Sequence, residues 1–304
     1  MDLERKHVIA LGFFDGVHLG HGALLKAARQ EAERLGCPAV ALSFDRHPGE
    51  LITGESVPLL TSPADRAGLM RRLYGVDEVR FCHFDRAMME MPWKEYVGGY
   101  LCGKLGAAHV VCGHDHRFGW RGDGNPTRLQ QASAQFGIGC TVVQKVEVDG
   151  ITVSSTYIRK LVAAGDVERA GAFLGHPHVL TGTVVHGKRL GRRLGTPTAN
   201  LLLPAGVLSP AFGVYAAMVA VGGRRYPAVT NVGVRPTVDG GGEITVEPWL
   251  LDYEGNLYGR EIRVEFYRFL RPERKFDSLE ALKEAIHRNA DETRDYFAKN
   301  PGAY

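Results

Sequence analysis

Two histidines, His18 and His21, stand three residues apart in the stretch GFFDGVHLGHG near the start of the chain. An apolar run precedes Gly12 and a helix-like segment follows, so we expect both imidazoles near the first turn of a helix that follows a strand. The free N–H groups and the dipole of such a turn favour an anion. Gly16 and Gly20 would let the backbone approach it closely. The pattern indicates a polyphosphate site in which imidazoles stabilise charge on phosphate oxygens.

A second stretch that could do chemistry is GTPTAN, residues 195–200, a turn that leads into the apolar LLLP. Thr198 and Asn200 are two residues apart in an extended segment, so we expect their side chains on one face. Two neutral oxygens suit a hard cation such as Mg²⁺. Water and substrate phosphate often supply the remaining ligands of this ion. Ordinary hydrogen bonding within the turn is the alternative. The preceding GKRLGRRLG could wrap phosphates, or it could form a solvated surface loop.

The first site needs a strand and a helix to position it, and the surrounding sequence predicts both. Short apolar runs alternate with helix-like segments from residue 8 to about residue 175, which favours a parallel sheet covered by helices. After the histidine motif, apolar residues recur at helical spacing, and Gly36 can end that helix. The recurring residues are Leu24 or Leu25, Ala28, Ala32 and Leu35.

The second site lies in a part of the sequence with a different residue pattern. After Gly175, segments such as HVLTGTVVHG, GVYAAMVAVGG and EIRVEFYRFL are β-rich and separated by Gly, Pro and Asn turns. We therefore expect a small antiparallel sheet closed as a barrel. A last helix should follow, because Asp277 and Glu280 have the spacing of a capping box. Its repeated apolar residues are Leu279, Leu282 and Ile286.

The chain of 304 residues is long enough for two domains, which we place at residues 1–177 and 178–304. Its net charge of +3 is too small to indicate nucleic acid as a partner. No run of about 18 apolar residues is present to span a membrane, and the charged N-terminus contains no apolar signal segment. Five cysteines, an odd number without CxxC spacing, favour free thiols. We expect a cytoplasmic protein.

Several motifs resemble a single family along nearly the whole chain. GFFDGVHLGH is similar to GNFDGVHLGH, the form that the HxGH nucleotidyltransferase signature takes in bacterial bifunctional riboflavin kinase/FAD synthetases. LSFDRHP, VVCGHDHRFG and SSTYIR resemble the family's TFDPHP, VVGxDFRFG and SSTxIR. GTVVHGKRLGRRLGTPTANL, GVYA, NVGVRPT, VEPWLLDYEGNLYG and RKF match the kinase half in order. Motifs from two domains in the same order are far more specific than HxGH alone.

For the first domain the resemblance implies a Rossmann-like α/β nucleotidyltransferase that transfers the adenylyl group of ATP to FMN, giving FAD and pyrophosphate. His18 and His21 would contact the ATP phosphates, and Asp115 and Phe118 would bind the flavin. Asp115 could instead be an ordinary turn residue. The implied ATP-binding residues are Gly12, Phe14, Asp15, Gly16, Ser155, Thr156 and Arg159. The types of Ser155, Thr156 and Arg159 agree with this role, since arginine offers a planar fork for phosphate and hydroxyls can donate at a helix start. The alternative is that SST merely caps a helix.

For the second domain the resemblance implies a small antiparallel β-barrel riboflavin kinase with a C-terminal helix, which phosphorylates the 5′-hydroxyl of riboflavin and releases ADP. Thr198 and Asn200 would lie near Mg²⁺, and Glu247 would be the general base. A carboxylate in an apolar strand is costly unless it is paired or functional, and an attacking alcohol needs a base. An outward-facing strand glutamate is the alternative. The implied phosphate-binding glycines are Gly187, Gly191 and Gly195.

Four differences separate the chain from the family pattern. Phe13 replaces the usual Asn of GNFDG, so one polar contact near the nucleotide is lost or supplied elsewhere. His116 replaces a Phe in the DFRFG segment. In the kinase half, Thr196 stands where Phe is usual, and Pro-Trp follows the glutamate where Thr-His is commoner. None of these differences removes a predicted catalytic group.

Three functions compete on this sequence. We expect the first, a bifunctional enzyme that converts riboflavin to FMN and FMN to FAD. The second is a riboflavin kinase joined to a degenerate nucleotidyltransferase that binds nucleotide or flavin as a regulatory module, which Phe13 would favour. The third is a metallohydrolase built on His18, His21 and the HDH at residues 114–116. No Glu accompanies the HxxH pair as in zinc protease helices.

Overall fold

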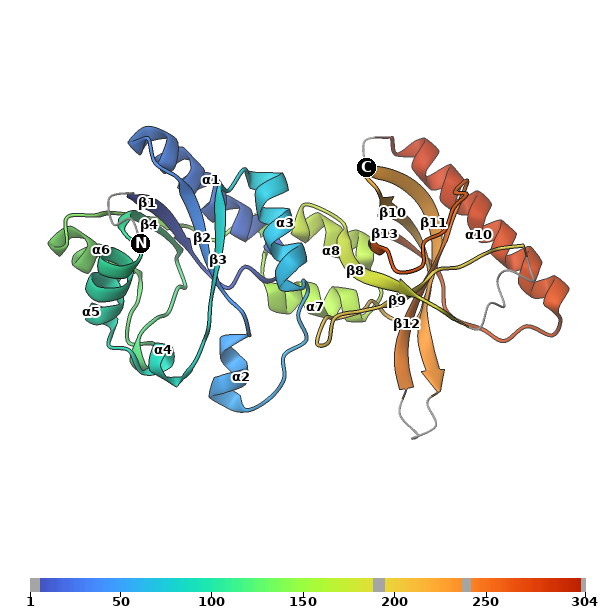
Figure 1. Ribbon diagram of the computed structural model, residues 1–304, viewed down its shortest axis with the longest axis horizontal. Helices are drawn as coiled ribbons and strands as arrows, with labels where there is room; N and C mark the ends of the chain where they lie inside the picture. Colours follow the sequence, from blue (N-terminus) through green and yellow to red (C-terminus); the bar gives the residue numbers. More distant parts are fainter. Residues whose placement is uncertain (1–5, 188–194, 237–241, 302–304) are drawn as a thin grey trace. The chain divides into compact units, whose positions relative to one another are not determined.

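The computed structural model describes residues 6–187, 195–236 and 242–301 (Figure 1). Its contacts divide the chain into two compact units. The first comprises Met1–Leu59 and Pro63–Ser155, and the second comprises Leu60–Ser62 and Thr156–Tyr304.

Two helices bear on the predicted domain boundary. The contacts group nearly all of α7 (Ser155–Ala163) and the whole of α8 (Val167–Leu174) with the second unit, and α8 packs against two barrel strands. The boundary at residues 177 and 178 would leave both helices with the first domain. Where the functional domains begin and end therefore stays a prediction.

The first unit is built on a five-stranded parallel sheet, which confirms the fold predicted for this part. The strand order is β3-β2-β1-β4-β5. Every residue of β1 is buried, as expected for a central strand with both faces covered. The order reverses between β1 and β4, so the crevice at their carboxyl ends is where such sheets bind ligands. The strands are β1 (His7–Leu11), β2 (Ala39–Phe44), β3 (Glu78–Cys82), β4 (Ala107–Gly113) and β5 (Gly139–Val143).

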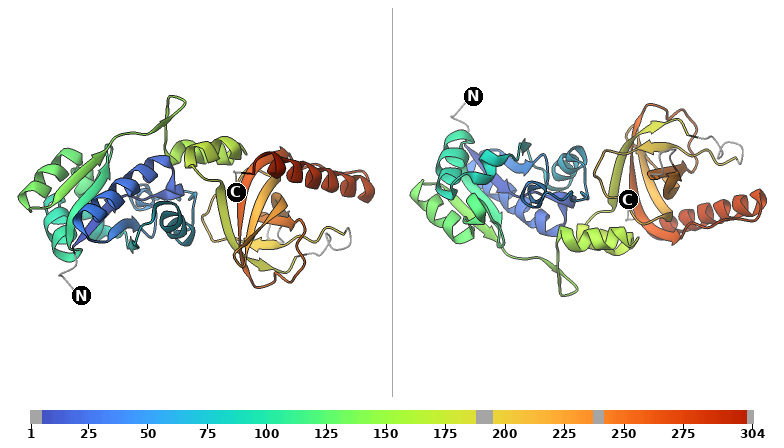
Figure 2. Two further views of the ribbon diagram at one scale, coloured as in Figure 1. Left: turned by 90° about the horizontal axis from the view of Figure 1, so that it is seen from above. Right: turned by 90° about the horizontal axis from the view of Figure 1, so that it is seen from below.

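Helix α1 (Leu19–Leu35) lies along this sheet (Figure 2) and contacts β1, β2, β4 and β5. It ends at Gly36, whose φ of 63° favours glycine, as predicted. Leu35, however, is 40% exposed and does not belong to the apolar face. The other described segments are η1 (Asp15–Val17), α2 (Pro48–Thr53), α3 (Pro63–Tyr74), α4 (Arg86–Glu90), α5 (Trp93–Glu95), η2 (Tyr96–Lys104), η3 (Trp120–Gly122), α6 (Pro126–Gln135), β6 (Glu147–Val148) and β7 (Ile151–Thr152).

The second unit contains the predicted closed antiparallel barrel, with its described strands in the order β10-β11-β12-β9-β8-β13. Successive side chains along β12 alternate between the two faces. Val246 and Leu250 pack in the barrel core, so Glu247 and Trp249 face outward. The strands are β8 (His178–Val185), β9 (Asn200–Leu202), β10 (Gly213–Val221), β11 (Arg224–Pro236), β12 (Gly242–Leu250) and β13 (Glu261–Arg271).

Helix α10 (Leu279–Lys299) packs on β11 and β10, across the outward face of the barrel (Figure 1). Its N-cap is Ser278, whose hydroxyl accepts a backbone N–H at 3.1 Å, so the cap predicted at Asp277 is wrong by one residue. The apolar residues predicted to repeat along this helix line a cavity: Leu279, Leu282 and Ile286. None of the helices in the described ranges is long and apolar enough to cross a membrane.

Candidate functional site

The chain turns sharply between β1 and α1. Phe14, Gly16 and Val17 all have positive φ, of 59°, 79° and 45°. Two of these residues lack the freedom of glycine, so their surroundings must hold the turn in place. The Ser155 hydroxyl contributes by donating to the backbone oxygen of Asp15 at 2.9 Å. The turn thereby fixes the point at which α1 begins.

His18 and His21 stack face to face at the start of α1. Their ring centroids are 3.5 Å apart and their planes differ by 12°. His18 is also the N-cap, because its Nδ1 accepts the backbone N–H of His21 at 3.2 Å. Gly20 leaves room for this cap, since a Cβ there would lie 3.1 Å from the His18 ring. Capping and pairing of the imidazoles therefore occur together.

The half-buried His21 imidazole is neutral at neutral pH. Burial, followed by the charges of His18 and Arg66, holds the pKa of His21 well below its usual value. Its Nδ1 is buried and has no hydrogen-bond partner among the described residues. A neutral imidazole still donates one hydrogen bond, and an anion placed beside it raises its affinity for a second proton. The pair is suited to respond to phosphate charge.

A cavity of about 400 Å³, here called the polar cavity, opens beside the two histidines. Its walls come from segments that follow β1, β4 and β5, so it lies at the crevice expected from the strand order. Phe14, Asp15 and Gly16 are buried in the turn and do not line it. The predicted site residues in its wall are Gly12, His18, His21, Asp115 and Ser155. Thr156 and Arg159 follow in α7, and their contact with phosphate stays a prediction.

A second cavity of the first unit, the apolar cavity, has a volume of about 540 Å³. Phe118 lines it, whereas Asp115, the other residue predicted to bind flavin, lines the polar cavity. His116 and Arg117 belong to both walls. The aromatic and long apolar side chains around it are Leu51, Ile52, Phe44, Phe84, Met88, Met89, Tyr96 and Trp120. A flat aromatic ring suits the apolar cavity, and an anion suits the polar one.

The histidines do not assemble into the metal cluster of the metallohydrolase hypothesis. Over the described ranges, no group of three or more His, Cys, Asp or Glu side chains is placed to hold a metal ion. His116 instead stacks on Phe118, with ring centroids 5.6 Å apart. The donor set that this hypothesis requires is therefore missing from the described part of the chain.

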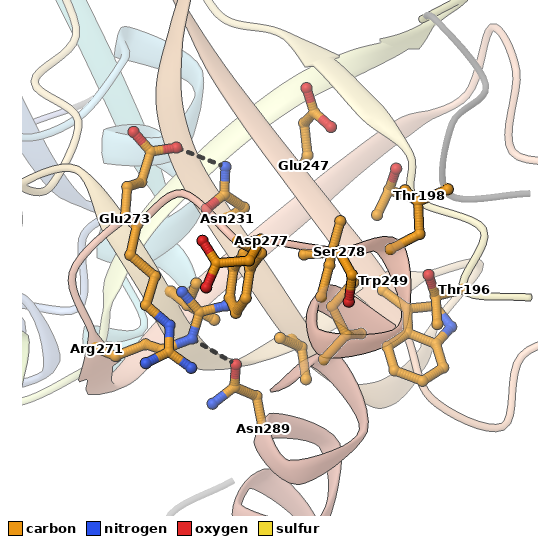
Figure 3. Close-up of a pocket in the computed structure, with 17 residues that line it drawn as sticks. Thr196, Thr198, Asn231, Glu247, Trp249, Arg271, Glu273, Asp277, Ser278 and Asn289 are labelled. Atoms are coloured by element: carbon orange, nitrogen blue, oxygen red, sulfur yellow. Dashed lines mark hydrogen bonds between the residues drawn. The ribbon is translucent and has the colours of Figure 1, made fainter. Parts of the chain in front are cut away.

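The second unit has a cavity of about 720 Å³ between the outer face of β10 to β12 and the first turns of α10 (Figure 3). Glu247 lines it, because the alternation along β12 turns this residue away from the barrel core. It lies directly opposite Asn231 of β11. Trp249 forms another part of the wall. The carboxylate predicted as a base therefore faces a cavity large enough for a ring ligand.

Thr198 and Asn200 lie on the segment that enters β9, the neighbour of β12 in the barrel. Thr198 lines the cavity together with the buried Thr196. Asn200 packs against Gly187, where a Cβ would come within 2.3 Å of the Asn200 Nδ2. The oxygens predicted to bind Mg²⁺ thus come from a segment beside Glu247.

The structure gives a different reason for glycine at each of two positions predicted to bind phosphate and does not describe the third. Position 187 requires glycine, because any larger side chain would collide with the Asn200 amide. Gly195 has a φ of 77°, a conformation that favours glycine, and no atom of the described residues lies within 4 Å of an added Cβ. Gly191 lies outside the described residues.

The cavity also contains polar contacts to which sequence reasoning assigned no role. The Asn231 Nδ2 donates to Glu273 Oε1 at 3.1 Å, and the Arg271 Nε donates to Asn289 Oδ1 at 2.9 Å (Figure 3). Asn231 belongs to the motif NVGVRPT, so a signal was present in the sequence. What the motif could not supply was the strand register that sets this residue opposite Glu247.

Comparisons with known proteins assign both halves of the chain. A family model described as FAD synthetase matches residues 1–157, and one described as riboflavin kinase matches residues 174–297. A solved structure from Streptococcus pneumoniae, described as a macrolide-efflux protein, has a TM-score of 0.86 and 30% identity. It covers 96% of this chain and 94% of its own chain, so the fold is shared over both halves.

Relatives of established name match over nearly their whole length. A protein of Pseudomonas fluorescens is 41% identical, covering 95% of this chain and 91% of the relative. One of Listeria monocytogenes is 37% identical, with 96% and 93% covered, and one of Bacillus subtilis is 34% identical, with 97% and 94% covered. Each is named bifunctional riboflavin kinase/FMN adenylyltransferase. Identity and coverage at this level show that the chain belongs to the bifunctional riboflavin kinase/FMN adenylyltransferase family.

Proposed function

We propose that the chain makes FAD from riboflavin in two ATP-dependent steps, one at each cavity system. The observation that carries this proposal is the placement of predicted reactive groups on cavity walls: the His18–His21 pair in the first unit and Glu247 with Thr198 in the second. All five cysteines are free thiols, which supports a cytoplasmic location.

In the first unit, a phosphate oxygen of FMN attacks the α-phosphorus of ATP. The bond from that phosphorus to the bridging oxygen of the β-phosphate breaks, and pyrophosphate leaves with FAD as the other product. His18 and His21 donate hydrogen bonds to phosphate oxygens as charge shifts onto the leaving group. The apolar cavity holds the flavin ring, and Asp115 and Phe118 contact FMN from the segment after β4.

In the second unit, the 5′-hydroxyl of riboflavin attacks the γ-phosphorus of ATP. Glu247 accepts the hydroxyl proton as the oxygen–phosphorus bond forms, and ADP leaves. Trp249 and the apolar stripe of α10 give the flavin ring an apolar wall, while Asn231 sits beside the base. No covalent enzyme intermediate is required, because positioning and charge stabilisation suffice for phosphoryl transfer.

The residues around Thr198 fit a magnesium ion. Its hydroxyl and the side-chain oxygen of Asn200 are hard donors, and both lie on the segment next to Glu247. When bound, Mg²⁺ supplies charge neutralisation for the ATP phosphates. Gly187 holds Asn200 in place from behind by leaving space for its amide.

The test is a chromatographic time course of riboflavin with ATP and Mg²⁺. The His21→Ala variant should form FMN normally and lose FAD formation by about 100-fold or more. The Glu247→Gln variant should lose FMN formation by about 100-fold or more, yet convert supplied FMN to FAD normally. His83→Ala and Glu261→Gln alter an exposed histidine and an exposed strand glutamate, and both should behave as the unmodified chain.

The same time course separates the rival functions. FMN that accumulates without any FAD, even when FMN is supplied directly, would leave a riboflavin kinase with a nucleotide- or flavin-binding first unit. The departure at Phe13, which lines the polar cavity, is the observation that favours this second candidate. Loss of both steps in either variant would contradict the assignment of one step to each unit.

A further inference from the structure

The polar and apolar cavities of the first unit meet at one short segment. His116 and Arg117 line both of them. Arg117 is exposed, whereas the half-buried ring of His116 stacks on Phe118 with an angle of 22° between the planes. A ligand that extends from one cavity into the other must pass this imidazole.

The His116 ring has an unused hydrogen-bonding atom. Its Nε2 is shielded from solvent and has no partner in the part of the chain that the structure describes. Burial lowers the pKa of His116 to about 4, so the imidazole is neutral at neutral pH. A neutral imidazole carries one donor and one acceptor nitrogen. Leaving a polar atom buried without a partner is unfavourable, unless a ligand or water supplies one.

We infer that His116 hydrogen-bonds the ribityl chain of FMN, an inference that rests on the proposed function. FMN consists of a flat ring, a hydroxylated chain and a phosphate, in that order. With the ring in the apolar cavity and the phosphate near His18 and His21, the chain lies at the wall that the cavities share. Hydroxyls both donate and accept, so they can pair with either tautomer of a neutral imidazole.

The sequence departures at this site support a contact that the family motifs do not provide. The motifs that it resembles have Asn at the position of Phe13 and Phe at the position of His116, and both residues line the polar cavity. The Phe13 ring lies 4.8 Å from the His47 ring and 4.2 Å from the guanidinium carbon of Arg66. The aromatic and polar groups have thus exchanged positions around one cavity, and His116 supplies the polar contact that Phe13 cannot make.

The test compares His116→Phe and His116→Gln with the unmodified full-length chain in the conversion of FMN and ATP to FAD. Loss of one neutral hydrogen bond should raise the KM for FMN about 3- to 10-fold in His116→Phe, while the KM for ATP changes by less than about 2-fold. His116→Gln keeps a donor and an acceptor, so its KM for FMN should stay within about 3-fold of the unmodified value. An unchanged KM for ATP reports that the first unit is folded, and phosphorylation of riboflavin, a reaction of the second unit, serves as the standard for enzyme concentration and should not change.

A second substrate in place of FMN identifies the part of the ligand that His116 contacts. With an FMN analogue whose side chain is an unsubstituted alkyl phosphate, His116→Phe and the unmodified chain should have equal KM values. A difference that persists with this analogue would place the contact on the flavin ring or the phosphate and overturn the ribityl assignment. An unchanged KM for FMN in His116→Phe would overturn the inference alone, whereas an unmodified chain that forms no FAD would overturn the proposed function and this inference with it.

The double variant Phe13→Asn/His116→Phe tests the exchange of positions directly. If Asn at position 13 can supply the polar contact, the KM for FMN should return to within about 3-fold of the unmodified value. A double variant that is no better than His116→Phe would refute the exchange. The KM for ATP in the same reaction again reports that the first unit, which carries both substitutions, is folded.

Discussion

Arg66 on α3 is fully buried beneath the turn that carries the histidine pair. Its Nη1 donates to the backbone oxygens of Phe13 at 3.1 Å and Phe44 at 3.2 Å, and to the Ser43 hydroxyl oxygen at 3.1 Å. Its Nη2 lies 3.9 Å from Asp15 Oδ1. A single guanidinium therefore ties the end of β2 to the turn after β1 and counters the strain of positive φ there.

Replacing Arg66 with Met should destabilise the first unit strongly, because several buried oxygens lose their donor at once. We expect the free energy of unfolding to fall by about 3 kcal/mol or more. Arg66→Lys keeps the charge without the planar fork and should give an intermediate loss. Urea unfolding measures both. Arg86→Met is the control, since this arginine is 81% exposed and should cost less than about 0.5 kcal/mol; equal effects of the two Met variants would contradict the argument.

At the residue scale, the sequence could point to His18, His21 and Thr198 because their types and spacing suit a ligand. It could not point to Arg66, because an arginine within a helix looks the same whether it faces solvent or the core. Its burial depends on acceptors from two distant segments. The sequence could not show either that the Nε2 of His116 lacks a partner among the described residues, since this follows from the packing of one loop between two cavities.

Among the elements, the contact of β8 with β9 positions the predicted magnesium ligand. Val185 pairs with Asn200, and Gly187 follows two residues later. In Gly187→Ala, the added Cβ would displace the Asn200 amide. We expect riboflavin phosphorylation to fall by about 10-fold or more, with a higher Mg²⁺ concentration needed for half-maximal rate. Initial rates at varied Mg²⁺ measure this, and formation of FAD from supplied FMN should not change.

Gly171→Ala is the matched control for this substitution. Gly171 lies within α8 of the same unit, and the nearest atom to an added Cβ there is 3.7 Å away. Alanine favours a helix over glycine, so this variant should retain full kinase activity. A Gly187→Ala enzyme with an unchanged Mg²⁺ dependence would show that Asn200 does not contribute to the metal site.

Periodicity predicted the elements well and their ends less well. β1, α1 and the closed barrel follow from runs and alternations that many residues share. The start of α10 depends on one choice between Asp277 and Ser278, two adjacent residues that both favour an N-cap, and the extended backbone at Ser278 decides it. Apolar spacing predicted the stripe of α10 without naming what it packs against, because such spacing indicates burial against any partner, and here it faces a cavity that a ligand can fill.

At the scale of the whole molecule, each unit has its own hydrophobic core. Ile9, Leu101 and Val110 belong to a cluster of the parallel sheet, while Tyr215 and Phe266 belong to a cluster of the barrel. The change from helix-strand alternation to β-rich sequence was enough to predict two units. It could not assign α7 and α8 to one of the two units. The periodicity of an amphipathic helix shows which face is apolar but does not show which surface that face covers.

Two half-buried histidines of the first unit, His21 and His116, should make its stability depend on pH. Burial lowers the pKa of His116 to about 4, and burial with the charges of His18 and Arg66 holds the pKa of His21 well below its usual value. In the unfolded chain both should titrate near about 6.5. Between these values the unfolded chain binds more protons than the folded one, so acid favours unfolding. The contribution of the neutral histidines to the free energy of unfolding is fully present above about pH 6.5 and is lost as the pH falls toward about 4.

For His116 alone, the expected loss in the free energy of unfolding between about pH 7 and about pH 5 is about 2 kcal/mol. Urea unfolding at the two pH values, followed by hydrogen exchange in peptides from β1 and β4, measures the change within this unit. The His116→Phe variant has no proton to gain at that position, so its loss should be smaller by about the same amount. Equal losses in the two proteins would show that the folded state admits the proton on His116 freely, and the Nε2 of this imidazole would then be solvated, not shielded.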